Sequence, residues 1–152
     1  MRIALSAALG VALFAGAATA APAKDAALTQ AVAFWHAHHC EPAPDETMWE
    51  HGWRFNVLYG DCGGGDGHDQ HVYFFDRGRF IGTDGLGTSS GIIGMWRDLD
   101  TIAFMYVLYR RHDPLCCATG GGAIVRYRFT GTAVKRLDPV PPRQLGKVAL
   151  GR

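Results

Sequence analysis

Histidine and aspartate side chains gather at two places in the sequence. His36 and His39 lie three residues apart at the end of a segment with helical periodicity, so their imidazoles would share one helix face. His68, Asp69 and His71 follow a glycine-rich stretch. Imidazole and carboxylate groups bind zinc and copper, and carboxylates also bind calcium, so the two clusters predict a composite metal site if the fold joins them. The alternative is that the helix-end histidines interact with the helix dipole and its unpaired carbonyl groups.

The glycine-rich segment has a second interpretation. Residues 64–69, Gly-Gly-Asp-Gly-His-Asp, match the start of a calcium-binding nonapeptide. Such turns bind calcium between stacked repeats, whereas this one is a single copy, and His71 stands where a large apolar residue is expected. A flexible polar loop is the favoured interpretation.

No established catalytic motif is present. A secreted calcium-dependent phospholipase has a His-Asp pair and a double cysteine, and this chain has similar residues at His112, Asp113 and 116–117. In that enzyme class, however, the cysteines precede the His-Asp pair. Pro114 would also interrupt the helix that holds them. Ser89 and Ser90 lack the spacing of a nucleophile elbow, and no glycine loop ends in the residues that hold a phosphate. The sequence therefore predicts no catalytic residues, and a non-enzymatic role is favoured.

Four cysteines, Cys40, Cys62, Cys116 and Cys117, are expected to form two disulfides in an exported chain. Three connectivities are possible. A bridge between the adjacent Cys116 and Cys117 is one of them, but pairing each with Cys40 or Cys62 closes longer loops and stabilises more in the chain-entropy model. The long-range pairings are favoured.

The N-terminus has the pattern of a cleavable signal peptide over residues 1–20. Arg2 precedes an apolar run to about residue 16, and Ala18-Thr19-Ala20 matches the cleavage site. The run is shorter than the roughly 20 residues that a membrane helix needs. We therefore expect a mature chain without a transmembrane segment, starting near Ala21, in the bacterial periplasm or outside the cell. No cysteine near the cut could accept a lipid, so a lipid anchor is not expected either.

Charge argues against a nucleic-acid partner. Removal of Arg2 takes one basic residue from 15 and leaves 14 against 14 acidic residues. A neutral chain has no field that attracts a polyanion, and Arg126 and Arg128 are interpreted as the solvated face of a strand.

Periodicity predicts an α+β fold. Residues 26–39 should form one amphipathic helix with Asp25 as its N-cap and Leu28 and Trp35 facing a sheet, and the prolines after Cys40 end it. Alternating apolar residues then predict strands around residues 53–57, 72–75, 79–81, 101–110, 125–129 and 134–137, with a tight turn at residues 76–78. We expect one mostly antiparallel meander sheet, stapled by disulfides, in a single domain over residues 21–142. Residues 143–152 read as a loose tail.

Several of these segments resemble the LppP/LprE lipoprotein family. The segments that match the family are V-Y-F-F-D-R-G-R-F-I-G-T at residues 72–83, D-P-L-C-C at 113–117 and L-D-P-V-P-P at 137–142. The resemblance spans about residues 62–142, with Ala118 where the family pattern has proline. It implies an exported bacterial protein and brings no catalytic residues. The expected function is thus an envelope or secreted module that binds a protein, glycan or lipid partner, and the alternative is a metal-handling or metal-dependent protein. The oligomeric state is left open.

Overall fold

The computed structural model describes residues 25–42, 48–62, 70–85, 91–110, 112–114, 116–139 and 141. The predicted signal peptide and the predicted tail lie outside these residues. No helix within the described ranges is long and apolar enough to cross a membrane.

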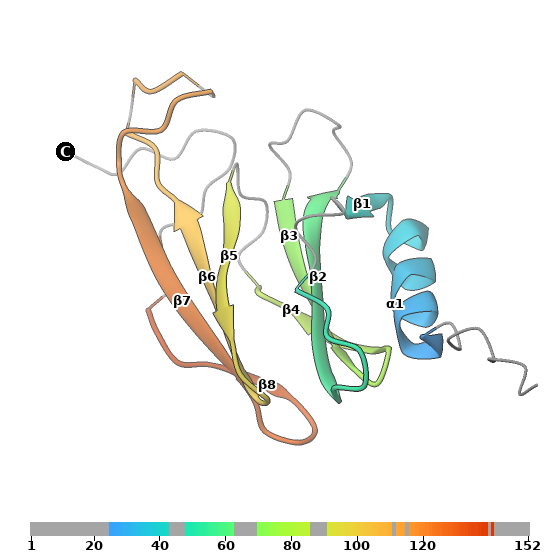
Figure 1. Cartoon of the computed structure of the whole chain (residues 1–152). Helices are drawn as coiled ribbons and strands as arrows, with labels where there is room; N and C mark the ends of the chain where they lie inside the picture. Colours follow the sequence, from blue (N-terminus) through green and yellow to red (C-terminus); the bar gives the residue numbers. More distant parts are fainter. Residues whose placement is uncertain are drawn as a thin grey trace, which may run out of the picture.

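The described part of the chain forms one helix and eight strands in two sheets (Figure 1). Helix α1 covers Ala26–Ala37. The first sheet has the order β1-β2-β3-β4, with bounds Cys40–Pro42, Phe55–Cys62, Gln70–Asp76 and Arg79–Thr83. The second has the order β5-β6-β7-β8, with bounds Ile92–Arg97, Thr101–Val107, Gly122–Phe129 and Val134–Arg136. Every pair of neighbouring strands is antiparallel, as predicted.

The prediction of a single meander sheet is wrong, because the strands divide into two sheets with a shared core. Side chains from β2 and β3 meet side chains from β5, β6 and β7 in one buried cluster, formed by Phe55, Val57, Tyr59, Val72, Phe74, Ile92, Ile102, Phe104, Tyr106, Val125 and Tyr127. Each strand contributes alternate residues, as the period of two requires. Two sheets with largely apolar inner faces bury one another, whereas a single helix can cover only one such face.

Helix α1 begins at the predicted N-cap. The Asp25 carboxylate accepts hydrogen bonds from the backbone N–H groups of Ala27 and Leu28, at 2.9 and 3.1 Å. It also accepts from Trp49 Nε1 at 3.0 Å and contacts His51 Nδ1 at 2.9 Å. The bond from Trp49 and that from Leu28 lower the pKa of Asp25. The cap therefore ties the helix start to the segment that leads into β2.

The buried residues of α1 lie beside the first sheet. Figure 1 shows the helix along the side of this sheet that faces away from the second sheet. Ala31 and Trp35 are fully buried in a cluster with Leu58 of β2 and Phe75 of β3. The outer surface of the first sheet thus contributes to a second, smaller core.

The hairpin from β3 to β4 confirms the predicted turn at residues 76–78. Arg77 and Gly78 both have positive φ, 49° and 81°, the backbone shape of a two-residue turn that matches strand twist. A Cβ on Gly78 would overlap the backbone of Ala27. Glycine is therefore required both for the turn and for the approach of the helix.

Polar contacts also join the sheets. The Arg97 guanidinium, at the end of β5, donates to Phe55 O at 2.6 Å, to Asn56 Oδ1 at 2.8 Å and to Met48 O. Between the sheets, the Tyr106 hydroxyl donates to Asp84 Oδ2 at 2.8 Å and lies 3.0 Å from the Tyr127 hydroxyl.

Candidate functional site

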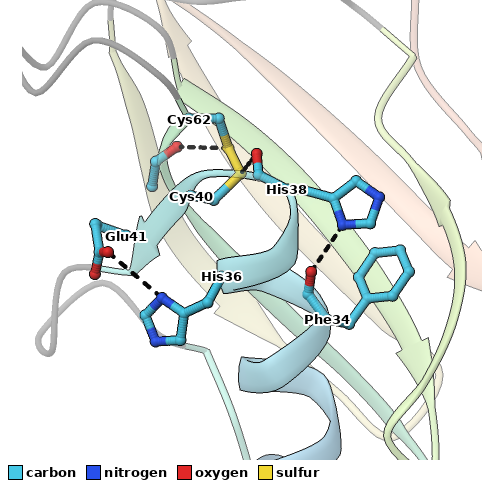
Figure 2. The surroundings of a disulfide bond; sticks show 7 residues. Phe34, His36, His38, Cys40, Glu41 and Cys62 are labelled. Carbon is cyan, nitrogen blue, oxygen red and sulfur yellow. Dashed lines mark hydrogen bonds and ion pairs between the residues drawn. A yellow bond between two sulfur atoms is a disulfide. The ribbon is translucent and has the colours of Figure 1, made fainter.

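The helix-end histidines make local contacts (Figure 2). His36 Nδ1 lies 3.4 Å from Glu41 Oε1, and His38 Nδ1 donates to Phe34 O at 2.8 Å. His39 has a φ of 59°, the left-handed backbone that commonly follows a helix. The helix ends at residue 37, two residues earlier than predicted, so His36 and His39 do not share a turn of regular helix.

The other predicted ligands belong to the β2–β3 region. His71 lies on β3 opposite Gly60, and its ring centre is 6.3 Å from that of Tyr73. The ring of His38 is 6.1 Å from the same Tyr73 ring. His68 and Asp69 lie outside the described residues. Among the residues that are described, no three histidine, cysteine or acidic side chains form a metal-binding group. The composite metal site stays a prediction.

The disulfides pair differently from the favoured long-range connectivity. Cys40 bonds to Cys62, and Cys116 bonds to its neighbour Cys117. The preference for linking the adjacent pair to Cys40 and Cys62 is therefore wrong. Its physical reason is the register, because Cys40 and Cys62 are direct partners across β1 and β2 (Figure 2), while the adjacent pair lies between β6 and β7.

Asp113 organises the segment that carries the adjacent cysteines. Its carboxylate accepts from Arg110 N, Thr119 N and Thr119 Oγ1, each at 2.7 Å. The bond from Arg110, followed by those from Thr119, lowers the pKa of Asp113. This buried carboxylate thus draws together two parts of the connection between β6 and β7.

A different surface is the strongest candidate for binding. We call it the outer face: the side of the second sheet that points away from the first. Outward residues alternate with buried ones along each strand. No described element packs on it, since α1 packs against the first sheet (Figure 1). Its members are Ile93, Met95, Trp96, Met105, Ile124, Arg126, Arg128 and Lys135.

The outer face is apolar at one end. Ile93 of β5 pairs with Met105 of β6, which pairs with Ile124 of β7, so three apolar side chains form a row across the sheet. Ile93 and Ile124 are 45% and 53% exposed, and Met95 and Trp96 beside them are similarly exposed. Large apolar side chains gathered on one surface, rather than scattered, mark an interaction site.

The other end of the outer face is charged. Arg128 pairs with Thr101 on one side and Lys135 on the other. The Arg126 guanidinium donates two hydrogen bonds to the Asp138 carboxylate, both at 2.8 Å, and its backbone N–H donates a third at the same distance. The side-chain bonds, followed by the backbone bond, lower the pKa of Asp138 to about 2. The face therefore grades from an apolar row to a polar rim that carries both signs of charge.

The free edge of β5 is occupied. Ile92 N donates to Gln70 Oε1 at 2.6 Å, and Gly94 N lies 3.4 Å from the Tyr59 hydroxyl. Side chains of the first sheet thus cap two backbone N–H groups that an added strand would use. A partner would contact the face of this sheet rather than extend its edge.

Sequence reasoning missed the outer face because it missed β5. Residues 92–96 are nearly all apolar and contain a register shift between Gly94 and Trp96, so they do not alternate. The signal that could have found this face was the alternation of side chains along β7, where odd and even positions point to opposite faces of the sheet. Once Val125 and Tyr127 are inward, Ile124 must point outward with Arg126.

Comparison with known proteins gives one informative result. No curated protein and no solved structure matches the chain. The family model described as LppP/LprE lipoprotein matches residues 54–132, which include both cysteines of the adjacent pair and the strands that form the apolar row. The match covers more than half of the sequence, and the chain belongs to the LppP/LprE lipoprotein family.

Proposed function

We propose that this chain is an exported, non-enzymatic module of the bacterial envelope, periplasmic or secreted, that binds a protein partner through the outer face. The single observation that carries the proposal is the in-register row of Ile93, Met105 and Ile124, in which both isoleucines are exposed and the methionine is half-buried. Membership in a lipoprotein family supports the envelope location.

The composition of the outer face favours a protein over a lipid or glycan partner. Methionine, tryptophan and arginine are enriched in protein interfaces, and the flexible thioethers of Met95 and Met105 can adapt to a partner's shape. The rim holds the Arg126–Asp138 ion pair as well as Lys135, so its charge is mixed. A surface for anionic lipid would carry a stronger excess of positive charge.

Site-specific photo-crosslinking in the producing bacterium tests the proposal. A photoreactive residue at Ile93 should form a discrete protein adduct, whereas the same residue at Gln30, exposed on α1, should not. The substitution Ile124→Asp should reduce the Ile93 adduct at least tenfold. The matched control Leu99→Asp adds the same charge at an exposed leucine in the turn after β5 and should leave the adduct unchanged.

Two outcomes would overturn the proposal, and a third would identify the protein partner as the chain itself. Equal labelling at Ile93 and Gln30 would show that the outer face is not a specific surface. An adduct of twice the chain's mass would make the partner a second copy of this chain. A lipid or glycan adduct without protein would replace the partner class.

A metal-handling role is the second candidate. It is favoured by the histidine–carboxylate contact between His36 and Glu41, and by the two rings of His38 and His71 at Tyr73. Binding of zinc, copper or calcium at 100 times its dissociation constant should stabilise the mature protein by about 2.7 kcal/mol. A rise in melting temperature that His36→Ala or His68→Ala abolishes would support this candidate. An unchanged melting temperature with all three ions would remove it.

A further inference from the structure

The two disulfides of the chain differ in their surroundings. Cys40 is fully buried at the start of β1, shortly after the end of α1, and its bond to Cys62 joins β1 to β2. Cys116 and Cys117 are both exposed, in the connection between β6 and β7. Only the second disulfide is open to a thiol from solution on both of its cysteines.

The Cys116–Cys117 bond contributes little to holding the chain folded. A disulfide stabilises mainly by restricting the unfolded chain, and this restriction grows with the length of chain that it closes. The separation is 22 residues for Cys40–Cys62 and 1 residue for Cys116–Cys117. Stapling the fold therefore accounts for the first bond and not for the second.

Other contacts fix the segment around the adjacent pair. Cys117 N donates to Pro114 O at 3.0 Å, which closes a turn without help from the sulfurs. Leu108 N donates to Gly121 O, and Gly120 N donates to Leu108 O, both at 2.9 Å. Together with the three bonds to the Asp113 carboxylate, these contacts keep both ends of the connection in place when the disulfide opens.

We propose that Cys116–Cys117 is a reversible redox site that undergoes thiol–disulfide exchange with a thiol-bearing partner molecule. A partner thiolate attacks one of the two sulfurs. A mixed disulfide forms, the Cys116–Cys117 bond breaks, and the other cysteine leaves as a thiolate that takes up a proton. A second partner thiol then attacks the partner sulfur of the mixed disulfide. The partner leaves as its own disulfide, and the chain holds two thiols, reduced by two electrons.

The charges of this connection suit the exchange. Arg110 is exposed on it, and positive charge near a cysteine stabilises the leaving thiolate. The negative charge of Asp113 is already engaged by three donors. Exposed disulfides that are not needed for the fold are the ones that exchange readily.

Graded reduction of the full mature protein tests the proposal. The protein is equilibrated with increasing dithiothreitol, free thiols are trapped by alkylation, and each cysteine is quantified by peptide mass spectrometry. Cys116 and Cys117 should reach half-reduction at a dithiothreitol concentration at least tenfold below that for Cys40 and Cys62. Oxidised glutathione should restore the bond.

The single variants Cys116→Ser and Cys117→Ser supply a second measurement. At least one should accumulate a mixed disulfide with glutathione, because the second cysteine that would expel it is absent. The circular dichroism of the protein with only the adjacent pair reduced should match that of the oxidised protein. The proposal is overturned if the adjacent pair opens no earlier than Cys40–Cys62, if its opening unfolds the chain, or if neither variant forms an adduct.

Discussion

Removal of the Tyr106 hydroxyl should destabilise the fold by about 2–3 kcal/mol. Tyr106 is 1% exposed, and its O–H donates to the Asp84 carboxylate, which is 3% exposed. Since this proton is committed to Asp84, the 3.0 Å contact with Tyr127 requires the Tyr127 O–H to donate to Tyr106. Burial, followed by the charge of Asp84, raises the pKa of Tyr106, so the hydroxyl stays protonated.

The magnitude follows from the two bonds that Tyr106→Phe removes. A hydrogen bond to a charged group contributes about 1.5–3 kcal/mol, and a neutral one about 0.5–1.5 kcal/mol. Asp84 has a further interaction besides this bond, so we place the loss near the lower end of the sum of the two ranges. The ring still fills its place between the sheets, so no apolar burial is lost.

Tyr127→Phe is the matched control. It removes one hydroxyl of the same kind from the same core but only the neutral bond, so the expected loss is about 1 kcal/mol. Urea unfolding of the oxidised proteins, followed by tryptophan fluorescence, gives both values by linear extrapolation, and an unchanged slope shows that the unfolded state is comparable. Equal losses in the two variants, or no loss in Tyr106→Phe, would refute the role assigned to Asp84.

Two further predictions concern the disulfides and acid stability. Alanine at both Cys40 and Cys62 should lower the free energy of unfolding by about 3 kcal/mol, because that bond spans 22 residues. Alanine at both Cys116 and Cys117 should lower it by less than about 1 kcal/mol, because that bond joins neighbours. Urea unfolding compares the two variants, and equal losses would contradict the conclusion that only the first bond staples the fold. The pKa of Asp138 is lowered from 3.8 to about 2, so the unfolded chain binds the proton first, and the stability from its pair with Arg126 is complete above pH 3.8 and is lost as the pH falls through 2. Asp138→Asn should therefore reduce the slope of unfolding free energy against pH in this window, and an unaltered slope would contradict the shift.

Local features of the fold could be predicted from the sequence because local chemistry decides them. Asp25 starts the helix through its own carboxylate, and Arg77 and Gly78 adopt the backbone of a hairpin turn in which glycine is the favoured second residue. Alternation likewise predicted most strands. The division into two sheets depends instead on which apolar faces meet, and strand periodicity does not carry that information.

The disulfide pairing failed for a related reason. The entropy argument ranks bonds by the length of chain that they close, but a bond forms only between sulfurs that the fold brings together. Cys40 meets Cys62 because β1 pairs with β2, and β1 is three residues long at the end of a helix. A strand that short gives no alternating pattern to read. The pairing of β1 with β2, and not the length of chain that a bond closes, therefore decides which cysteines form the disulfide.

The outer face shows that the alternation of inward and outward residues along a strand can indicate a binding surface from the sequence alone. Val125 and Tyr127 alternate with Arg126 and Arg128, and this pattern correctly separates core from solvent on β7. The same alternation places Ile124 on the arginine side, where an apolar residue contributes nothing to the core. An apolar residue at an outward-pointing position of a strand is not needed to form the core of the fold. When its neighbours on β5 and β6 repeat the exception in register, as Ile93 and Met105 do, three independent strands retain exposed apolar surface at one place, which is the reason to search for a partner there.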